Sequence, residues 1–460
     1  MNIRFALVAS AVALALPLSA ADLQVAPGTT FSVTGFFGLG LKQASISNSV
    51  RPGLSTETRL DDNTSRLFFT GSAKIMDGWN VVFTVGSRFT TDVRPADAVL
   101  SNVTASNSLT VSQATGWADD DTWAGILSPY GRLIMGKNSF YWSDTIGLPH
   151  IAPVLDAPGE CYRVWDANGL ATFNILNQAM SLIKSGILVN NYTLGITRSR
   201  NVVRYDSPNW SGVDLAVLWS KNPIGNELWW PGFDTPGTSG TTNYARNYAD
   251  GNTTYLRLRY NGKGMSLFGS MLNQKIQGGV YNTALYGGPQ DVSAYRLGAS
   301  YKFPFGTKVG VVYDHTSIAN GVAGTALVAY TGFNTTTNTG IASVIMAPGS
   351  ITTGDASRNA YEITVSHPFK DFMAHVTYAK AGNMASVAST GANQLNLAVD
   401  YALTKRTFVG LQYSTLKNDS NGHYSPFLTN FSFGATAPNT PAGYNGENWS
   451  QLSLNLQFWF

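Results

Sequence analysis

One stretch of the sequence comes close to a phosphate-binding loop, which would give the chain nucleotide chemistry. Gly131, Gly136 and Lys137 have the spacing of that motif, but Asn138 stands where the motif requires Ser or Thr. The residues between the two glycines alternate as in a β-strand, whereas the motif needs a glycine-rich loop that leads into a helix. The stretch therefore predicts a strand and no nucleotide site.

The histidines and the single cysteine could in principle bind a metal or attack a substrate. Cys161 has no identifiable base to activate it, and one cysteine excludes a disulfide within the chain. The five histidines are too dispersed for metal-ligand spacing: His150, His315, His367, His375 and His423. We predict no metal, no cofactor and no enzymatic activity.

The overall charge argues against a nucleic-acid partner. The chain has 30 basic and 27 acidic residues, and Arg4 is the only charged residue among the first 21, so 29 and 27 remain after them. This balance is too even for nucleic-acid binding. Charged residues make up only 12%, about half of the roughly 25% usual in globular domains. Low charge together with 46 glycines and 12% aromatics suits a barrel with a lipid-facing wall.

The first 21 residues have the features of a secretory signal peptide. Arg4 is followed by an apolar run at 5–16 and by small residues at 19–21, where cleavage would occur. No later stretch of 18 or more residues is apolar throughout, so no transmembrane helix is predicted. We expect a signal peptide at 1–21 and one β-barrel at 22–460.

Apolar and polar residues alternate along most of the mature chain, and residues 451–460 show this best. One set of side chains there is apolar (Leu452, Leu454, Leu456, Phe458 and Phe460), and the other is mainly polar (Ser453, Asn455, Gln457 and Trp459). In water such strands would need a second sheet to cover them. In a bilayer they need only lipid, provided that the sheet closes. An aromatic terminus also suits the interface girdle of an outer-membrane barrel.

The connections between the strands differ sharply in length. Seven are short and rich in turn-forming residues: 76–78, 129–131, 209–212, 261–264, 304–306, 368–371 and 403–406. Between them lie long polar segments at 43–61, 90–118, 221–252, 317–357 and 418–446. We therefore predict an all-β protein, a transmembrane antiparallel barrel of about sixteen strands. An extra hairpin within a long segment stays possible.

Several stretches in order resemble the general porins of Gram-negative bacteria, which are trimeric sixteen-stranded channels. They are 65–71 with the turn at 77–78, 123–126 with 131–137, 203–209, 401–407 and the terminal Phe460. The resemblance implies an outer-membrane location, contact with membrane lipid, a homotrimer and passive diffusion of small hydrophilic solutes and ions. It also implies a long third loop, about 138–195, that folds into the barrel and narrows it.

The expected constriction sets arginines on the wall against acids on this loop. The loop acids are Asp144, Asp156, Glu160 and Asp166. Arg66 and Arg204 match wall positions of the family, and their alternation places them inward. The same alternation places Arg88, Arg257, Arg259 and Arg296 inward without such a match. Asp120 stands where the family often has a basic residue, and Phe36 stands at another such position. Inward basic residues outnumber acidic ones, which indicates a weak preference for anions.

Two other functions stay open at the level of sequence. An eighteen-stranded sugar channel would line its pore with rows of aromatic residues instead of arginines and acids. An outer-membrane enzyme would carry a Ser–His pair within hydrogen-bond reach on its outer wall.

Overall fold

The computed structural model describes residues 23–49, 56–61, 65–88, 118, 120–141, 198–221, 251–276, 290–319, 327–334, 339–346, 357–422, 424 and 446–460. Every regular element in these ranges is a β-strand. No helix among them is long and apolar enough to cross a membrane. The expected signal peptide lies outside the described residues.

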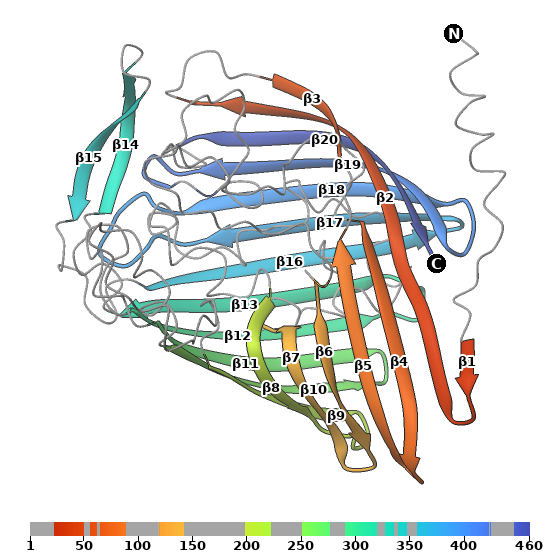
Figure 1. The fold of residues 1–460 in the computed structure, drawn as a ribbon. Helices are drawn as coiled ribbons and strands as arrows, with labels where there is room; N and C mark the ends of the chain where they lie inside the picture. The colour runs from red at the N-terminus through yellow and green to blue at the C-terminus, as the bar shows by residue number, and fades with distance from the viewer. Residues whose placement is uncertain are drawn as a thin grey trace, which may run out of the picture.

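Sixteen antiparallel strands form one closed ring (Figure 1). Each strand pairs with the next along the chain, and β20 returns to pair with β2, so no edge is left open. The strands are β2 (Thr29–Ser47), β4 (Arg66–Met76), β5 (Trp79–Arg88), β6 (Thr122–Ser128), β7 (Gly131–Ser139), β8 (Arg198–Asp206), β9 (Val213–Lys221), β10 (Gly251–Gly262), β11 (Met265–Ile276), β12 (Gln290–Lys302), β13 (Lys308–Ala319), β16 (Ser357–Phe369), β17 (Phe372–Ala381), β18 (Ala392–Ala402), β19 (Thr407–Asn418) and β20 (Asn448–Trp459). The predicted strand number is confirmed.

The long first strand corrects one prediction. β2 pairs with β4 through its first half and with β3 (Thr56–Asp61) through its second half. β1 (Leu23–Ala26) forms a short ladder with the start of β2. The segment 43–61 was expected to be a loop, but its two ends are strand. The expectation was wrong because the polarity is inverted here: Ala44 and Ile46 face inward, and polar Gln43 and Ser47 face outward.

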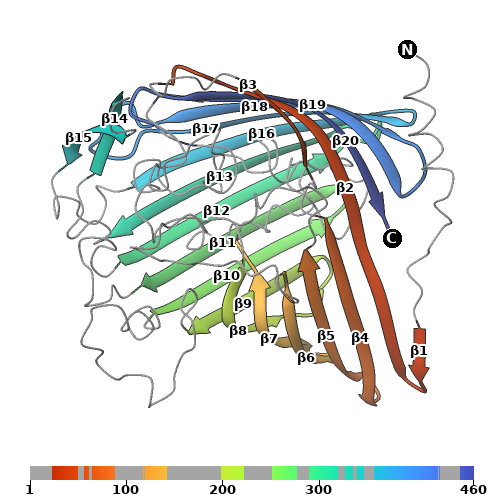
Figure 2. The same ribbon diagram turned by 45° about the horizontal axis from the view of Figure 1, so that its top comes forward.

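An extra hairpin does occur in the long segment 317–357. β14 (Leu327–Asn334) and β15 (Thr339–Met346) pair only with each other among the described strands. In both views the pair lies beyond the ends of β13 and β16, outside the ring (Figures 1 and 2). The hairpin therefore leaves the strand count of the barrel unchanged.

The seven short connections all join neighbouring strands as predicted. Gly78, with φ +77°, and Gly264, also with φ +77°, occupy two of these turns. Glycine suits both because it enters the left-handed region without the steric cost of a side chain. The short turns fix the register of seven hairpins.

The barrel is apolar outside and polar inside, the reverse of a soluble protein. On β20, Leu452 and Leu454 are 44% and 51% exposed, whereas Ser453 and Asn455 are almost fully buried. The same alternation runs through β17 and β19. An exposed apolar wall of this extent suits lipid and would be an aggregation hazard in water.

Candidate functional site in the barrel interior

The first interior ion pair joins two residues that the sequence placed on the wall. Arg66 of β4 points inward, and its Nε lies 3.1 Å from Oδ2 of Asp120, with both side chains buried. Asp120 is held just before β6 because its backbone N–H donates to the carbonyl of Gly86 at 3.0 Å. Arg88 lies opposite Arg66 in the ladder between β4 and β5, but its side chain is outside the described part.

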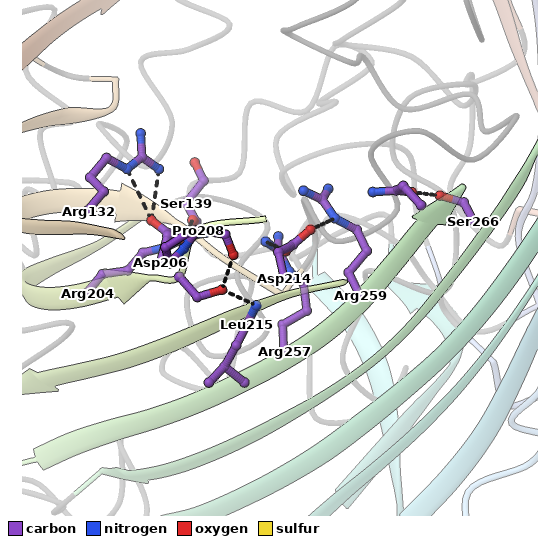
Figure 3. A network of polar contacts seen from close by, with 12 residues as sticks. Arg132, Ser139, Arg204, Asp206, Pro208, Asp214, Leu215, Arg257, Arg259 and Ser266 are labelled. Carbon is purple, nitrogen blue, oxygen red and sulfur yellow. Dashed lines mark hydrogen bonds and ion pairs between the residues drawn. The ribbon is translucent and has the colours of Figure 1, made fainter. Parts of the chain in front are cut away.

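Asp206, at the end of β8, is shared by two arginines (Figure 3). Arg204 donates from Nε and Nη2 to Oδ1 at 2.9 and 2.7 Å. Arg132, directly opposite on β7, donates from Nη2 to Oδ2 at 2.9 Å and stacks over Trp123. Two positive charges thus meet one carboxylate.

Asp214 on β9 repeats this arrangement (Figure 3). Arg259 lies directly opposite in the ladder and donates from Nε to Oδ2 at 2.9 Å. Arg257, two residues away on the same face of β10, donates from Nη2 to Oδ1 at 3.0 Å.

Asp314 on β13 is the third shared carboxylate and the most deeply buried of the three. Arg296 lies directly opposite on β12, with Nη2 3.0 Å from Oδ2. Arg358 on β16 approaches Oδ1 to 3.7 Å. We call these sets the three arginine pairs: Arg132 with Arg204, Arg257 with Arg259, and Arg296 with Arg358. Each set carries one more positive than negative charge.

The root of the third loop also reaches Asp314. Tyr141 follows β7, yet its hydroxyl donates to Oδ2 of Asp314 at 2.8 Å, and its ring lies 4.5 Å from the Arg296 guanidinium. The chain has therefore crossed the interior, because β12 and β13 lie five and six strands further round the ring. Phe140 packs on Tyr255 of β10, with 5.4 Å between ring centroids. Residues 140 and 141 thus point into the barrel, and the rest of the expected loop lies outside the described residues.

A second connecting segment reaches Arg358, the other arginine beside Asp314. Tyr424, beyond the end of β19, accepts a hydrogen bond from Nη1 of Arg358 at 3.4 Å, and its ring lies 5.6 Å from that guanidinium. Tyr141 and Tyr424 are both almost fully buried. Asp314 thus links the segment after β7 to the segment after β19.

The described ion pairs of the wall arginines lie within the barrel, and their expected pairing with the loop acids falls outside the described residues. Arg66, Arg204, Arg257, Arg259 and Arg296 lie in the interior as predicted by alternation, and each forms a described ion pair with a carboxylate of the barrel itself. Arg204 also donates to Asn138 and Ser139, and Arg296 donates to the carbonyl of Tyr141. Five further inward residues follow the same alternation but were not predicted as site residues: Arg132, Asp206, Asp214, Asp314 and Arg358. The loop acids Asp144, Asp156, Glu160 and Asp166 lie outside the described residues, as do Cys161, His150 and His423.

Neither alternative function gains support from the described wall. The ring has sixteen strands, and its interior between β7 and β16 carries arginines and acids instead of rows of aromatic residues. On the outer wall His315 contacts Asn359 and His367 contacts Thr307, so no Ser–His pair is described there. No group of three or more His, Cys, Asp or Glu within the described ranges could hold a metal.

Known proteins resemble this chain in sequence or in fold. A family model described as Gram-negative porin matches residues 6–421. A search of the curated proteins finds no match. The fold is similar to an anion-selective porin from Comamonas acidovorans, with 14% identity, a TM-score of 0.60, and coverage of 94% of this chain and 100% of that one. It is also similar to OmpT of Vibrio cholerae (9% identity, TM-score 0.54, coverage 96% and 100%) and to the outer-membrane channel DcaP of Acinetobacter baumannii (12%, 0.53, 96% and 100%).

Proposed function

This chain belongs to the Gram-negative porin family of outer-membrane channels, and we propose that it passes small hydrophilic solutes and ions by passive diffusion with a weak preference for anions. The observation that carries the preference is the set of three arginine pairs. Each places two guanidinium groups on one carboxylate, so each keeps a net positive charge. The similarity in fold to a porin described as anion-selective agrees with this proposal.

The mechanism needs no catalytic chemistry. A positive wall lowers the electrostatic energy of an anion that has shed part of its hydration, and raises that of a cation. The arginines are held in place because their shared carboxylates fix the guanidinium planes. Basic side chains exceed acidic ones among these buried or inward residues: Lys42, Arg66, Arg132, Arg204, Arg257, Arg259, Arg296, Lys308 and Arg358 against Asp120, Asp206, Asp214, Asp314, Glu362, Asp400 and Glu447. The excess supports anion entry.

The proposal also includes a constriction loop and a signal peptide. The segment 138–195 narrows the pore, with Asp144, Asp156, Glu160 and Asp166 facing the wall arginines. Residues 1–21 direct export and are removed.

Three copies assemble into a homotrimer, which is the oligomeric state that the resemblance to the general porins implies. Electrophoresis of the unheated, detergent-solubilised protein tests the assembly: a species of three chains supports it, and a monomer contradicts it.

The reversal potential across a planar bilayer in a salt gradient tests the selectivity. The reversal potential of wild-type channels should have the sign of an anion-preferring channel, which we call the anion side. Arg259→Gln should move the potential toward the cation side, because the set around Asp214 becomes neutral. Lys380→Gln removes one positive charge from the outer wall and is the control, so it should change nothing. A cation-side potential in the wild type, or equal shifts in both variants, would overturn the proposal.

A further inference from the structure

A second sector of the interior carries no charge. The inward side chains of β19 and β20 are amides, hydroxyls, apolar groups and glycine, with no charged residue among them. The nearest inward charges flank these strands: Lys42 on β2 lies opposite Ser453, Glu447 lies just before β20, and Asp400 on β18 pairs with His375 at 3.1 Å. The three arginine pairs lie on β7 to β16, in another part of the ring. The interior thus has a charged sector and a neutral one.

The inward hydrogen-bonding groups of β19 and β20, together with Asn396 of neighbouring β18, form a continuous line. We call it the amide track, and it comprises Asn396, Gln412, Gln451, Ser453, Asn455 and Gln457, all buried. At about 3.3 Å per residue, its part on β20 runs for roughly 20 Å along the strand. Within the track Asn455 donates to Ser453 at 3.0 Å, and Asn396 accepts a hydrogen bond from neighbouring Gln394 at 3.3 Å.

Other amide atoms of the track have no partner in the described part of the chain. Both Nε2 and Oε1 of Gln457 and Nδ2 of Asn396 are buried without a hydrogen bond. Such groups are costly to leave unsatisfied, so native proteins usually give them a partner. These atoms can therefore hydrogen-bond to water or to a polar solute along the track.

The surroundings of the track limit what that partner can be. Asn455 lies between Gly40 and Gly410 in the ladders, and Gly38 lies beside Gln457, so backbone without side chains flanks both amides. Phe36 and Trp459 form a ring contact at one end, with 4.9 Å between centroids, and Phe408 lies beside Gln457. Amides that both donate and accept, next to apolar rings, match hydroxyl groups on a compact carbon frame.

We propose that the amide track is a binding path for neutral polyhydroxylated solutes, that is, sugars and polyols. The inference rests on the proposed function as an open diffusion channel. A hydroxyl group donates and accepts as a carboxamide does, so each can satisfy the other. The net charge of the arginine pairs attracts an anion but not a neutral solute, whereas the amides of the track offer a neutral solute both donors and acceptors. The two sectors therefore act on different classes of solute.

The test measures the swelling of liposomes that contain the full channel. The probes are arabinose and a polyethylene glycol of the same hydrodynamic radius, both at low concentration. The test variants are Gln457→Met and Asn396→Leu, which keep side-chain size and remove the amides. Losing one hydrogen bond of ordinary strength should lower the ratio of arabinose to glycol flux about threefold for each variant, and about tenfold for both.

A matched control lies in the charged sector. Gln274 on β11 is equally buried, and neither of its amide atoms has a described partner. Gln274→Met should leave the flux ratio unchanged, and Gln457→Asn, which keeps an amide, should retain most of it. An equal loss in the Gln274 variant, equal losses of both probes, or no loss at all would overturn the proposal. The last two outcomes would indicate that the protein's own chain covers the track.

The reversal potential separates this failure from failure of the proposed function. The track variants should leave it unchanged because they remove no charge. An unchanged flux ratio with a normal anion-side potential would reject the track alone. A cation-side potential in the wild type would reject the anion preference and leave the track to be judged on its own flux ratio.

Discussion

Removing the hydroxyl of Tyr141 should loosen the root of the third loop. In Tyr141→Phe the ring can still stack on Arg296, but the hydrogen bond to Asp314 at 2.8 Å is lost. A hydrogen bond to a charged group contributes about 1.5–3 kcal/mol. The undocked state of the loop root should then be populated about 10- to 100-fold more than in the wild type.

Single-channel recording detects this change. A loop that leaves the wall more often should add brief steps to the current at constant voltage, and the variance of the open-channel current should rise. Asp314→Asn should have a larger effect, because it leaves Arg296 and Arg358 buried without their carboxylate, a loss of about 3–5 kcal/mol.

Tyr313→Phe is the matched control for this experiment. Tyr313 lies next to Asp314 on β13, but its hydroxyl faces outward and donates to Asn359 at 2.8 Å. This variant should record like the wild type. If Tyr141→Phe gives the same quiet current as Tyr313→Phe, the hydroxyl does not hold the loop root, and the reasoning fails. If both variants are equally noisy, the effect belongs to general barrel stability.

Two further changes test the inner and the outer face of the barrel wall. Asp214→Asn raises the net charge beside Arg257 and Arg259, so the reversal potential should move further to the anion side; a shift to the cation side would contradict the electrostatic account. Leu454→Arg places a charge in the middle of the outer face of β20 and should cost roughly 2–4 kcal/mol of folding into lipid vesicles. The same change at Tyr130, which is 74% exposed at a short turn, should cost much less, and equal losses would show that the outer face is not in hydrocarbon.

The barrel was predictable from sequence because its strands are specified locally. Lipid outside and water inside impose one alternation on every strand, and each short turn marks where a hairpin reverses. The prediction failed where that rule does not hold. At Ala44 and Ile46 the inward residues are apolar, and a segment of strand was therefore assigned to a loop.

The interior ion pairs were predictable only in part, because the register between two strands can be counted across a short turn but not across a long connecting segment. Arg296 and Asp314 face each other across a short turn at 304–306, so counting residues from that turn would have paired them. Arg259 and Asp214 lie on β10 and β9, which the long segment 222–250 joins. No local signal sets that register. The contact of Tyr141 with Asp314 depends on the path of a whole loop and was likewise beyond local reasoning.

The pairing of β20 with β2 has a consequence for assembly. Phe37 lies opposite Phe458, so the closing ladder joins residues from nearly opposite ends of the sequence. The ring cannot shut until its last strand has been synthesised and exported, and until then two unpaired strand edges stay available to other chains. Such distant contacts form slowly. The incomplete sheet is therefore most exposed to aggregation just before its two ends meet.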